Sequence, residues 1–127
     1  MNNPASFFIL LLLTITYLQS SYDKLFYWKD NVNWLNSHFS KTFLKNSVPF
    51  VLAVILILEL ITGILAIAGM VQLLYNGERV YGFYAAVLSC IILALLLFGQ
   101  RLAKDYDGAR TIVIYYIPSV LAVFWLN

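Results

Sequence analysis

The sequence predicts an all-α membrane protein, with four transmembrane helices in an antiparallel bundle and an amphipathic interfacial helix in the first loop. Of its 127 residues, 62% are hydrophobic and only 11% are charged. The mean hydropathy is +0.83. A soluble domain is nearer half apolar and a quarter charged, and a soluble core of this size could not hide so many apolar side chains. The composition therefore favours the bilayer as solvent.

Four apolar segments of spanning or near-spanning length carry this composition. They lie at about residues 5–22, 48–75, 80–98 and 109–126. A membrane helix needs roughly 20 residues, within a range of about 17–25. The second segment is longer and must tilt, kink or emerge into water, and the fourth contains Pro118, whose missing N–H favours a kink. We expect one transmembrane domain over residues 1–127.

The basic residues predict the orientation of these spans. One loop holds only Arg79, whereas the other two loops hold seven basic residues: Lys24, Lys29, Lys41, Lys45, Arg101, Lys104 and Arg110. The positive-inside rule places the two richer loops in the cytoplasm and both termini outside.

The first loop contains an amphipathic segment at about residues 25–39. Its apolar residues fall at i, i+3, i+7, i+10 and i+14: Leu25, Trp28, Val32, Leu35 and Phe39. At 100° per residue they share one helical face, as in a helix that lies in the membrane interface. Trp28 and Trp34 suit the headgroup level. The segment is either a surface-lying connector or a docking surface or lid over a site.

One carboxylate, Glu59, interrupts the apolar run VLAVILILELITGILAIAGM at residues 51–70. Counted at about 1.5 Å per residue from Val48, it lies about 16 Å into its helix, near the bilayer middle. Its helical face continues with small residues, which predicts that it points into the bundle: Thr62, Gly63, Ala66 and Gly69. The third span carries a matching ladder for close contact: Gly82, Ala86, Cys90 and Ala94.

The same depth count gives a candidate buried polar or ligand site around Glu59, made of Tyr17, Thr62, Ser89 and Tyr116. No Lys or Arg is expected at this depth, because Arg101 lies roughly 10 Å away by helical rise. Since desolvation disfavours a charged carboxylate, we expect Glu59 to be protonated and hydrogen-bonded. It serves either as a proton or headgroup site or for helix packing alone.

A second candidate, for binding a lipid or a partner, lies at the basic end of the third span, in FGQRLAKDYDGAR at residues 98–110. Arg101 and Asp105 have the i, i+4 spacing of an ion pair, and Gly108 suits a helix C-terminus. Arg101 and Lys104 suit an anionic lipid, a quinone head or a partner protein, or they are ordinary snorkelling residues. Trp28 and Trp34 extend this candidate set.

The sequence does not predict chemistry of its own. One cysteine excludes a dithiol relay within the chain, and one histidine, His38, cannot supply bis-histidine haem ligation. No metal-ligand cluster, GxSxG, P-loop or dinucleotide fingerprint occurs. A net charge of +2 is too small to indicate nucleic acid as a partner. We therefore expect no catalytic residue, no metal site and no cofactor in the chain itself.

Three short stretches point to a family: ELITGILAIAGM from Glu59, QSSYDK from Gln19 and GQRLAKDYDGA from Gly99. In these stretches the chain resembles the DoxX family of small four-helix bacterial membrane proteins, which is named after a terminal quinol oxidase subunit. The resemblance implies a bacterial inner-membrane protein, with quinone or lipid as a possible ligand. The branch of that family that handles disulfides needs paired cysteines, and this chain has Cys90 alone.

Two functions remain open. The first is an accessory or interaction subunit of a larger membrane complex, possibly a quinol or redox complex, with membrane lipid and other membrane subunits as partners. The second is a small proton-coupled transporter, or a lipid or quinone carrier, with Glu59 as the proton site. The chain length favours the first, because 127 residues leave little room for inverted repeats.

The predicted topology can be tested by single-cysteine labelling in a background where Cys90 is replaced. Cysteines at Asn2 and Asn76 should react with an impermeant reagent in intact spheroplasts, because both positions are expected to face the periplasm. A cysteine at Lys41 should react only after the membrane is opened. Labelling of Lys41→Cys in intact spheroplasts would reverse the assignment.

Overall fold

The computed structural model describes residues 4–42 and 46–126, which form five helices. They are α1 (Pro4–Phe26), α2 (Trp28–His38), α3 (Val48–Tyr75), α4 (Val80–Leu102) and α5 (Tyr106–Leu126). All except α2 are long and apolar enough to cross a membrane. The all-helical class and the four membrane-length helices predicted from the sequence are thereby confirmed.

The helix bounds differ from the predicted spans mainly where polar residues continue a helix. α3 has the expected bounds, but α1 extends through Lys24 to Phe26 and α4 extends to Leu102. Lys, Gln and Arg are good helix formers, so the end of an apolar run does not mark the end of a helix. At Tyr27 the backbone leaves the helical region, with φ −122° and ψ 40°, and this break separates α1 from α2.

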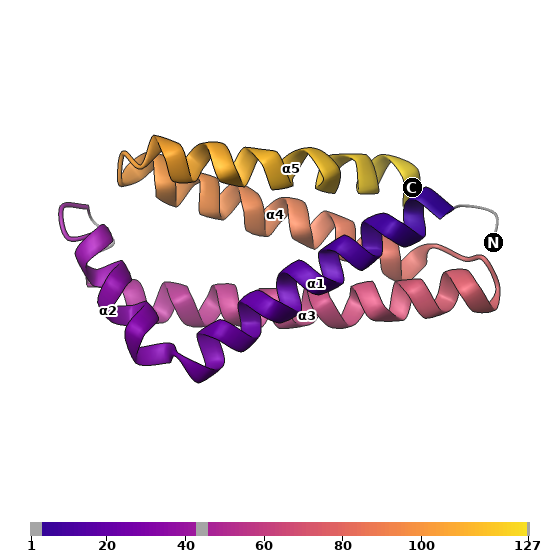
Figure 1. Cartoon of the computed structure of the whole chain (residues 1–127), viewed down its shortest axis with the longest axis horizontal. Coiled ribbons are helices and arrows are strands. Elements are labelled where there is room, and N and C mark those ends of the chain that lie inside the picture. Colours follow the sequence, from indigo (N-terminus) through magenta and orange to yellow (C-terminus); the bar gives the residue numbers. More distant parts are fainter. Residues whose placement is uncertain (1–3, 43–45, 127) are drawn as a thin grey trace.

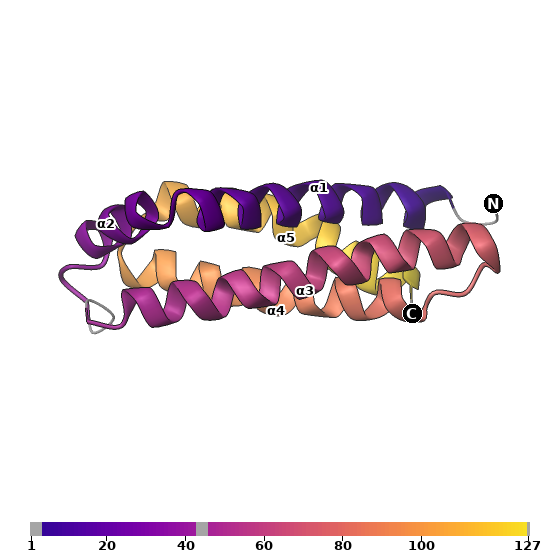
Figure 2. The same ribbon diagram turned by 90° about the horizontal axis from the view of Figure 1, so that it is seen from below.

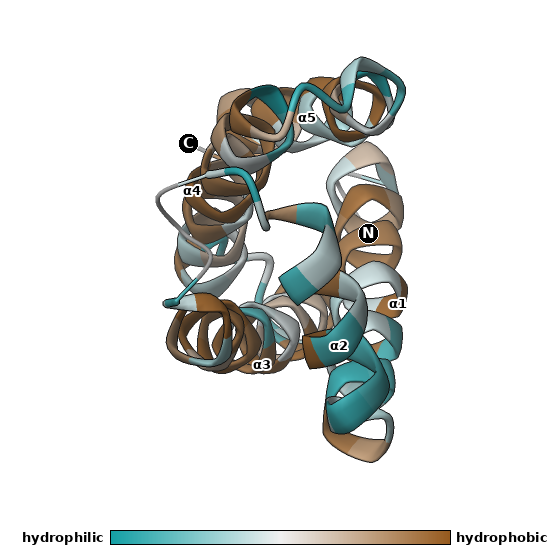
Figure 3. Ribbon diagram, turned by 90° about the vertical axis from the view of Figure 1, so that its left-hand side faces the viewer, coloured by the Kyte–Doolittle hydropathy of each residue, from teal (hydrophilic) through white to brown (hydrophobic). Residues whose placement is uncertain are grey.

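The four long helices pack against one another in the order α1, α3, α4 and α5, and α1 also contacts α5 (Figures 1 and 2). The start of α1 and the end of α5 lie at one end of the molecule, and α2 lies at the other. The long helices are mostly apolar, whereas α2 is largely polar (Figure 3). Their outward faces carry large apolar side chains, including Phe8, Ile57, Ile64 and Phe124. Such a surface suits lipid rather than water.

A close helix contact joins α3 and α4 at Gly69 and Gly82. A Cβ atom added to Gly69 would lie 2.7 Å from the Gly82 backbone. This approach is possible only without side chains, as expected from the two small-residue faces. The predicted ladder on α4 fits only in part, because Gly82 and Ala86 are buried but Cys90 is half-buried and Ala94 is exposed. A row at i+4 steps rotates by about 40° a step, so its later members face away from α3.

Away from this contact, α3 and α4 diverge toward the end that holds α2 (Figure 1). The residues that face the gap there are large, including Phe39, Leu52 and Phe98. The two helices therefore form a wedge, closed at the glycine contact and open near α2.

Gly69→Val should lower the free energy of unfolding by about 1–3 kcal/mol, the usual cost of overpacking, because its side chain would collide with the Gly82 backbone. Gly99→Ala is the matched control, since a Cβ there lies 3.5 Å from Phe39 Cζ, an ordinary contact. Equilibrium unfolding in mixed SDS and dodecylmaltoside micelles measures both. Equal stability of the two variants would contradict the close contact.

Candidate functional site

Three hydroxyl groups join three helices in the core of the bundle. Tyr17 Oη lies 2.7 Å from Ser89 Oγ, which lies 2.8 Å from Ser119 Oγ. Ser119 also donates to the Tyr115 carbonyl at 3.1 Å. Its proton is therefore committed, so Ser89 donates to Ser119 and Tyr17 donates to Ser89. This chain of bonds satisfies all three buried hydroxyls without any charge.

The predicted polar layer is assembled only in part. Tyr17 and Ser89 meet, but Thr62 Oγ1 donates to the Leu58 carbonyl at 2.8 Å, within its own helix. Tyr116 is half-buried and lines an open groove between α4 and α5, together with Cys90. A depth count gives the level of a residue but not its face, which explains why Ser119 rather than Tyr116 joins the layer.

Glu59 points into the interior, with 2% of its surface exposed, and its partner there is Lys24. Lys24 Nζ lies 3.2 Å from each carboxylate oxygen and also donates to Ser20 Oγ at 2.6 Å. This contact corrects the expectation that no cation reaches the depth of Glu59. The protonated state expected for Glu59 from the sequence stays a prediction.

Lys24 was assigned to a loop because the apolar run of the first span ends before it. In the structure it lies in the last turn of α1. α1 ends beside the first half of α3 rather than level with its start (Figure 1). Counting residues from the start of each helix, as if all helices began at the same membrane depth, therefore gives the wrong depth for Lys24. The flexible four-carbon stem of lysine covers the remaining distance to Glu59.

The second predicted cluster, at residues 98–110, does not have the arrangement that its residue spacing predicts. Asp105 does not continue the α4 helix, which ends at Leu102, so the i, i+4 geometry with Arg101 does not apply. Instead, Asp105 Oδ1 accepts the backbone N–H of Gly108 at 2.9 Å. Asp105 thus caps the start of α5. Gly108 lies in the first turn of that helix, which corrects its expected place at a helix C-terminus.

Arg101 and Lys104, two of the three basic residues of this cluster, face outward. The Arg101 guanidinium lies 5.1 Å from the centroid of the Tyr106 ring, a cation–π distance. Lys104 is exposed and adopts the left-handed backbone conformation that ends α4, with φ 60°. Both side chains remain available at the end of the bundle, as the predicted lipid- or partner-binding role requires.

His38, at the end of α2, attaches that helix to α4 and α5. Its Nε2 lies 2.7 Å from Gln100 Oε1 and 3.6 Å from Asp105 Oδ2. Its ring stacks on Trp34 with a centroid distance of 4.5 Å. The apolar face predicted for α2 turns partly inward, since Trp28, Val32, Leu35 and Phe39 are half-buried. Leu25 belongs to α1 instead and is 53% exposed.

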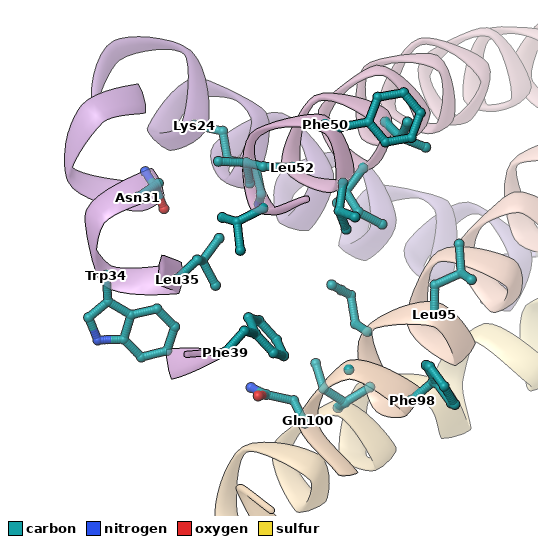
Figure 4. A pocket seen from close by; sticks show the side chains of 17 residues that line it. Lys24, Asn31, Trp34, Leu35, Phe39, Phe50, Leu52, Leu95, Phe98 and Gln100 are labelled. Atoms are coloured by element: carbon teal, nitrogen blue, oxygen red, sulfur yellow. The ribbon is translucent and has the colours of Figure 1, made fainter. Parts of the chain in front are cut away.

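A pocket of about 470 Å³ lies in the open part of the wedge, between α2, the first turns of α3 and the last turns of α4 (Figure 4). Most of its wall is apolar. The charged or amide side chains on it are Lys24, Asn31 and Gln100. Phe50 and Phe98 line it from α3 and α4, and they are 72% and 59% exposed. Of the pocket walls, the sequence indicated only the one formed by α2, through the apolar residues that share one face of that helix.

No family model, curated protein or solved structure matches the chain.

Lys24→Met should lower the free energy of unfolding by about 3–5 kcal/mol, because it leaves the Glu59 carboxylate buried without a counter-charge. Glu59→Gln should cost less, since the Lys24 side chain is 16% exposed and can shift its ammonium group toward the pocket. The double variant Lys24→Met/Glu59→Gln should recover most of the loss.

Unfolding in mixed SDS and dodecylmaltoside micelles gives the three values. If the stability losses of the two single variants simply add in the double variant, the two side chains are not coupled. The assignment of a buried Lys24–Glu59 pair would then be wrong.

Proposed function

We propose that this chain is a four-span membrane protein that binds a membrane-soluble amphiphile in the pocket between α2, α3 and α4. The observation that carries the proposal is the pocket itself, whose wall is apolar except for Lys24, Asn31 and Gln100. Its volume of about 470 Å³ falls within the range of about 300–1,000 Å³ typical of small-molecule sites.

The surroundings of the pocket support a ligand that arrives from the membrane. Four lining residues on α3 and α4 are exposed on the outside of the bundle: Phe50, Val54, Leu95 and Phe98. They continue the apolar surface that would face lipid. A ligand that moves between the two helices would therefore leave one apolar phase for another, and it would not need to cross water.

The arrangement in the membrane is part of the proposal. The four long helices form an antiparallel bundle in a bacterial inner membrane, and α2 lies at the cytoplasmic interface. Lys24 is internal, so it no longer counts toward the orientation. Among the described residues, five basic side chains still lie at the α2 end: Lys29, Lys41, Arg101, Lys104 and Arg110. The positive-inside rule continues to favour periplasmic termini. The pocket then lies in the cytoplasmic half of the bilayer.

The resemblance to the DoxX family supports a setting for this binding. In that setting the chain is an accessory subunit of a larger, possibly quinol or redox, complex, with lipid or quinone as the ligand and other membrane subunits as partners. The alternative role as a proton-coupled transporter is less favoured, because the Lys24 ammonium lies 3.2 Å from both oxygens of Glu59. Both carboxylate oxygens thus already have a hydrogen-bond partner.

Filling the pocket should abolish ligand binding. Val51 is half-buried in the α3 wall, so Val51→Phe should occupy the space. Ile57→Phe is the matched control, because Ile57 lies on the same helix, is 57% exposed and does not line the pocket. Native mass spectrometry after extraction in mild detergent should show a bound amphiphile on the wild type and the control only. Equal occupancy of both variants would contradict the assignment of the pocket.

A further inference from the structure

We infer that the pocket selects an uncharged single-chain lipid, whose hydroxyl or ester oxygen accepts a hydrogen bond from Lys24 Nζ. This inference rests on the proposed function and adds the chemical class of the ligand. It follows from the bonding of the ammonium group, from the charges around the pocket and from the position of Lys24 opposite the opening.

The bonding of Lys24 leaves one donor for the pocket. A lysine ammonium group has three N–H donors. One is directed to Ser20 Oγ at 2.6 Å. The two equal distances of 3.2 Å to the Glu59 oxygens fit a second N–H that both oxygens share. Lys24 also lines the pocket, and we assign its third N–H to an oxygen of the ligand.

The charges around Lys24 disfavour a charged ligand. The Lys24–Glu59 pair has no net charge, so an anionic headgroup would bring a second negative charge to one ammonium group at low dielectric. A cationic headgroup would instead be repelled by Lys24 itself. A neutral acceptor satisfies the third N–H without these costs.

The position of Lys24 in the pocket sets the direction in which the hydrocarbon chain of the lipid runs. Lys24 lies across the pocket from Phe98, and the residues between them are mostly apolar (Figure 4). A headgroup at Lys24 therefore places the hydrocarbon chain along Leu52 and Leu95 toward the opening between Phe50 and Phe98. One polar end and one apolar wall match a single-chain lipid, and the pocket volume of about 470 Å³ is that of a small-molecule site.

Tryptophan quenching provides the test. The chain has three tryptophans, and of these Trp34 lines the pocket, so Trp28→Phe/Trp125→Phe leaves a single reporter. The protein is placed in phosphatidylcholine nanodiscs at alkaline pH. Three probes carry the same dibrominated chain: a monoacylglycerol, an ionised fatty acid and an alkyltrimethylammonium.

The monoacylglycerol should quench Trp34 saturably, with an affinity roughly tenfold above that of either charged probe. Adding Lys24→Met/Glu59→Gln, which removes the donor without leaving a charge, should weaken monoacylglycerol binding by roughly three- to tenfold, the worth of one hydrogen bond. Adding Val51→Phe should remove the saturable quenching, whereas Ile57→Phe should preserve it.

The contrary outcomes separate the two proposals. If a charged probe binds as tightly as the monoacylglycerol, or if the double variant binds the monoacylglycerol unchanged, the inference about the headgroup is overturned while the pocket remains a binding site. The proposed function fails as well if no probe quenches Trp34 fluorescence saturably. It also fails if the monoacylglycerol quenches Trp34 equally in the Val51→Phe and Ile57→Phe variants.

Discussion

The ion pair between Lys24 and Glu59 determines how the rest of the bundle is arranged. A carboxylate with 2% exposure needs a counter-charge, because an uncompensated buried charge costs several kcal/mol. Lys24 reaches Glu59 because α1 ends beside the first half of α3. The chain then turns at Tyr27 and continues as α2, which occupies the remaining length of the bundle. The pocket is the space that this short, partly polar helix does not fill.

At the end of the molecule away from α2, the helices α3 and α4 pack closely instead of leaving a pocket between them. Lipid provides little hydrophobic force between helices, so close packing and polar contacts must hold them together. At Gly69 and Gly82 the α3 and α4 backbones touch. Near α2 the same helices carry Phe50 and Phe98, which keep the surface apolar but cannot close the gap. One pair of helices thus supplies both a close contact of the bundle and the opening of its pocket.

The number of spans and the inward direction of Glu59 could be predicted, because hydropathy and small-residue faces are local properties of one helix. The partner of Glu59 could not, because it depends on where α1 ends relative to α3, and no single-helix pattern records that offset. The same limit explains the second cluster. The i, i+4 spacing of Arg101 and Asp105 predicts an ion pair only if both residues lie on one continuous helix. In the structure α4 ends at Leu102, between them, and Asp105 caps α5. Tyr116 was misplaced for the related reason that depth was counted without direction.

The core contacts follow one another along the bundle, and the buried Lys24–Glu59 pair lies next to the pocket. The glycine contact comes first, and the neutral hydroxyl chain from Tyr17 through Ser89 to Ser119 follows. These groups complete one another and offer nothing to a ligand. The ion pair comes last, and its lysine is the member that faces the pocket wall. Beyond it, α2 is held by half-buried apolar residues and by the His38 contacts, and it has no fully buried side chain. Few buried contacts mean a low free energy of local opening. The pocket wall made by α2 is therefore the part of the fold that opens locally most easily, while the buried Lys24–Glu59 pair beside it stays fixed.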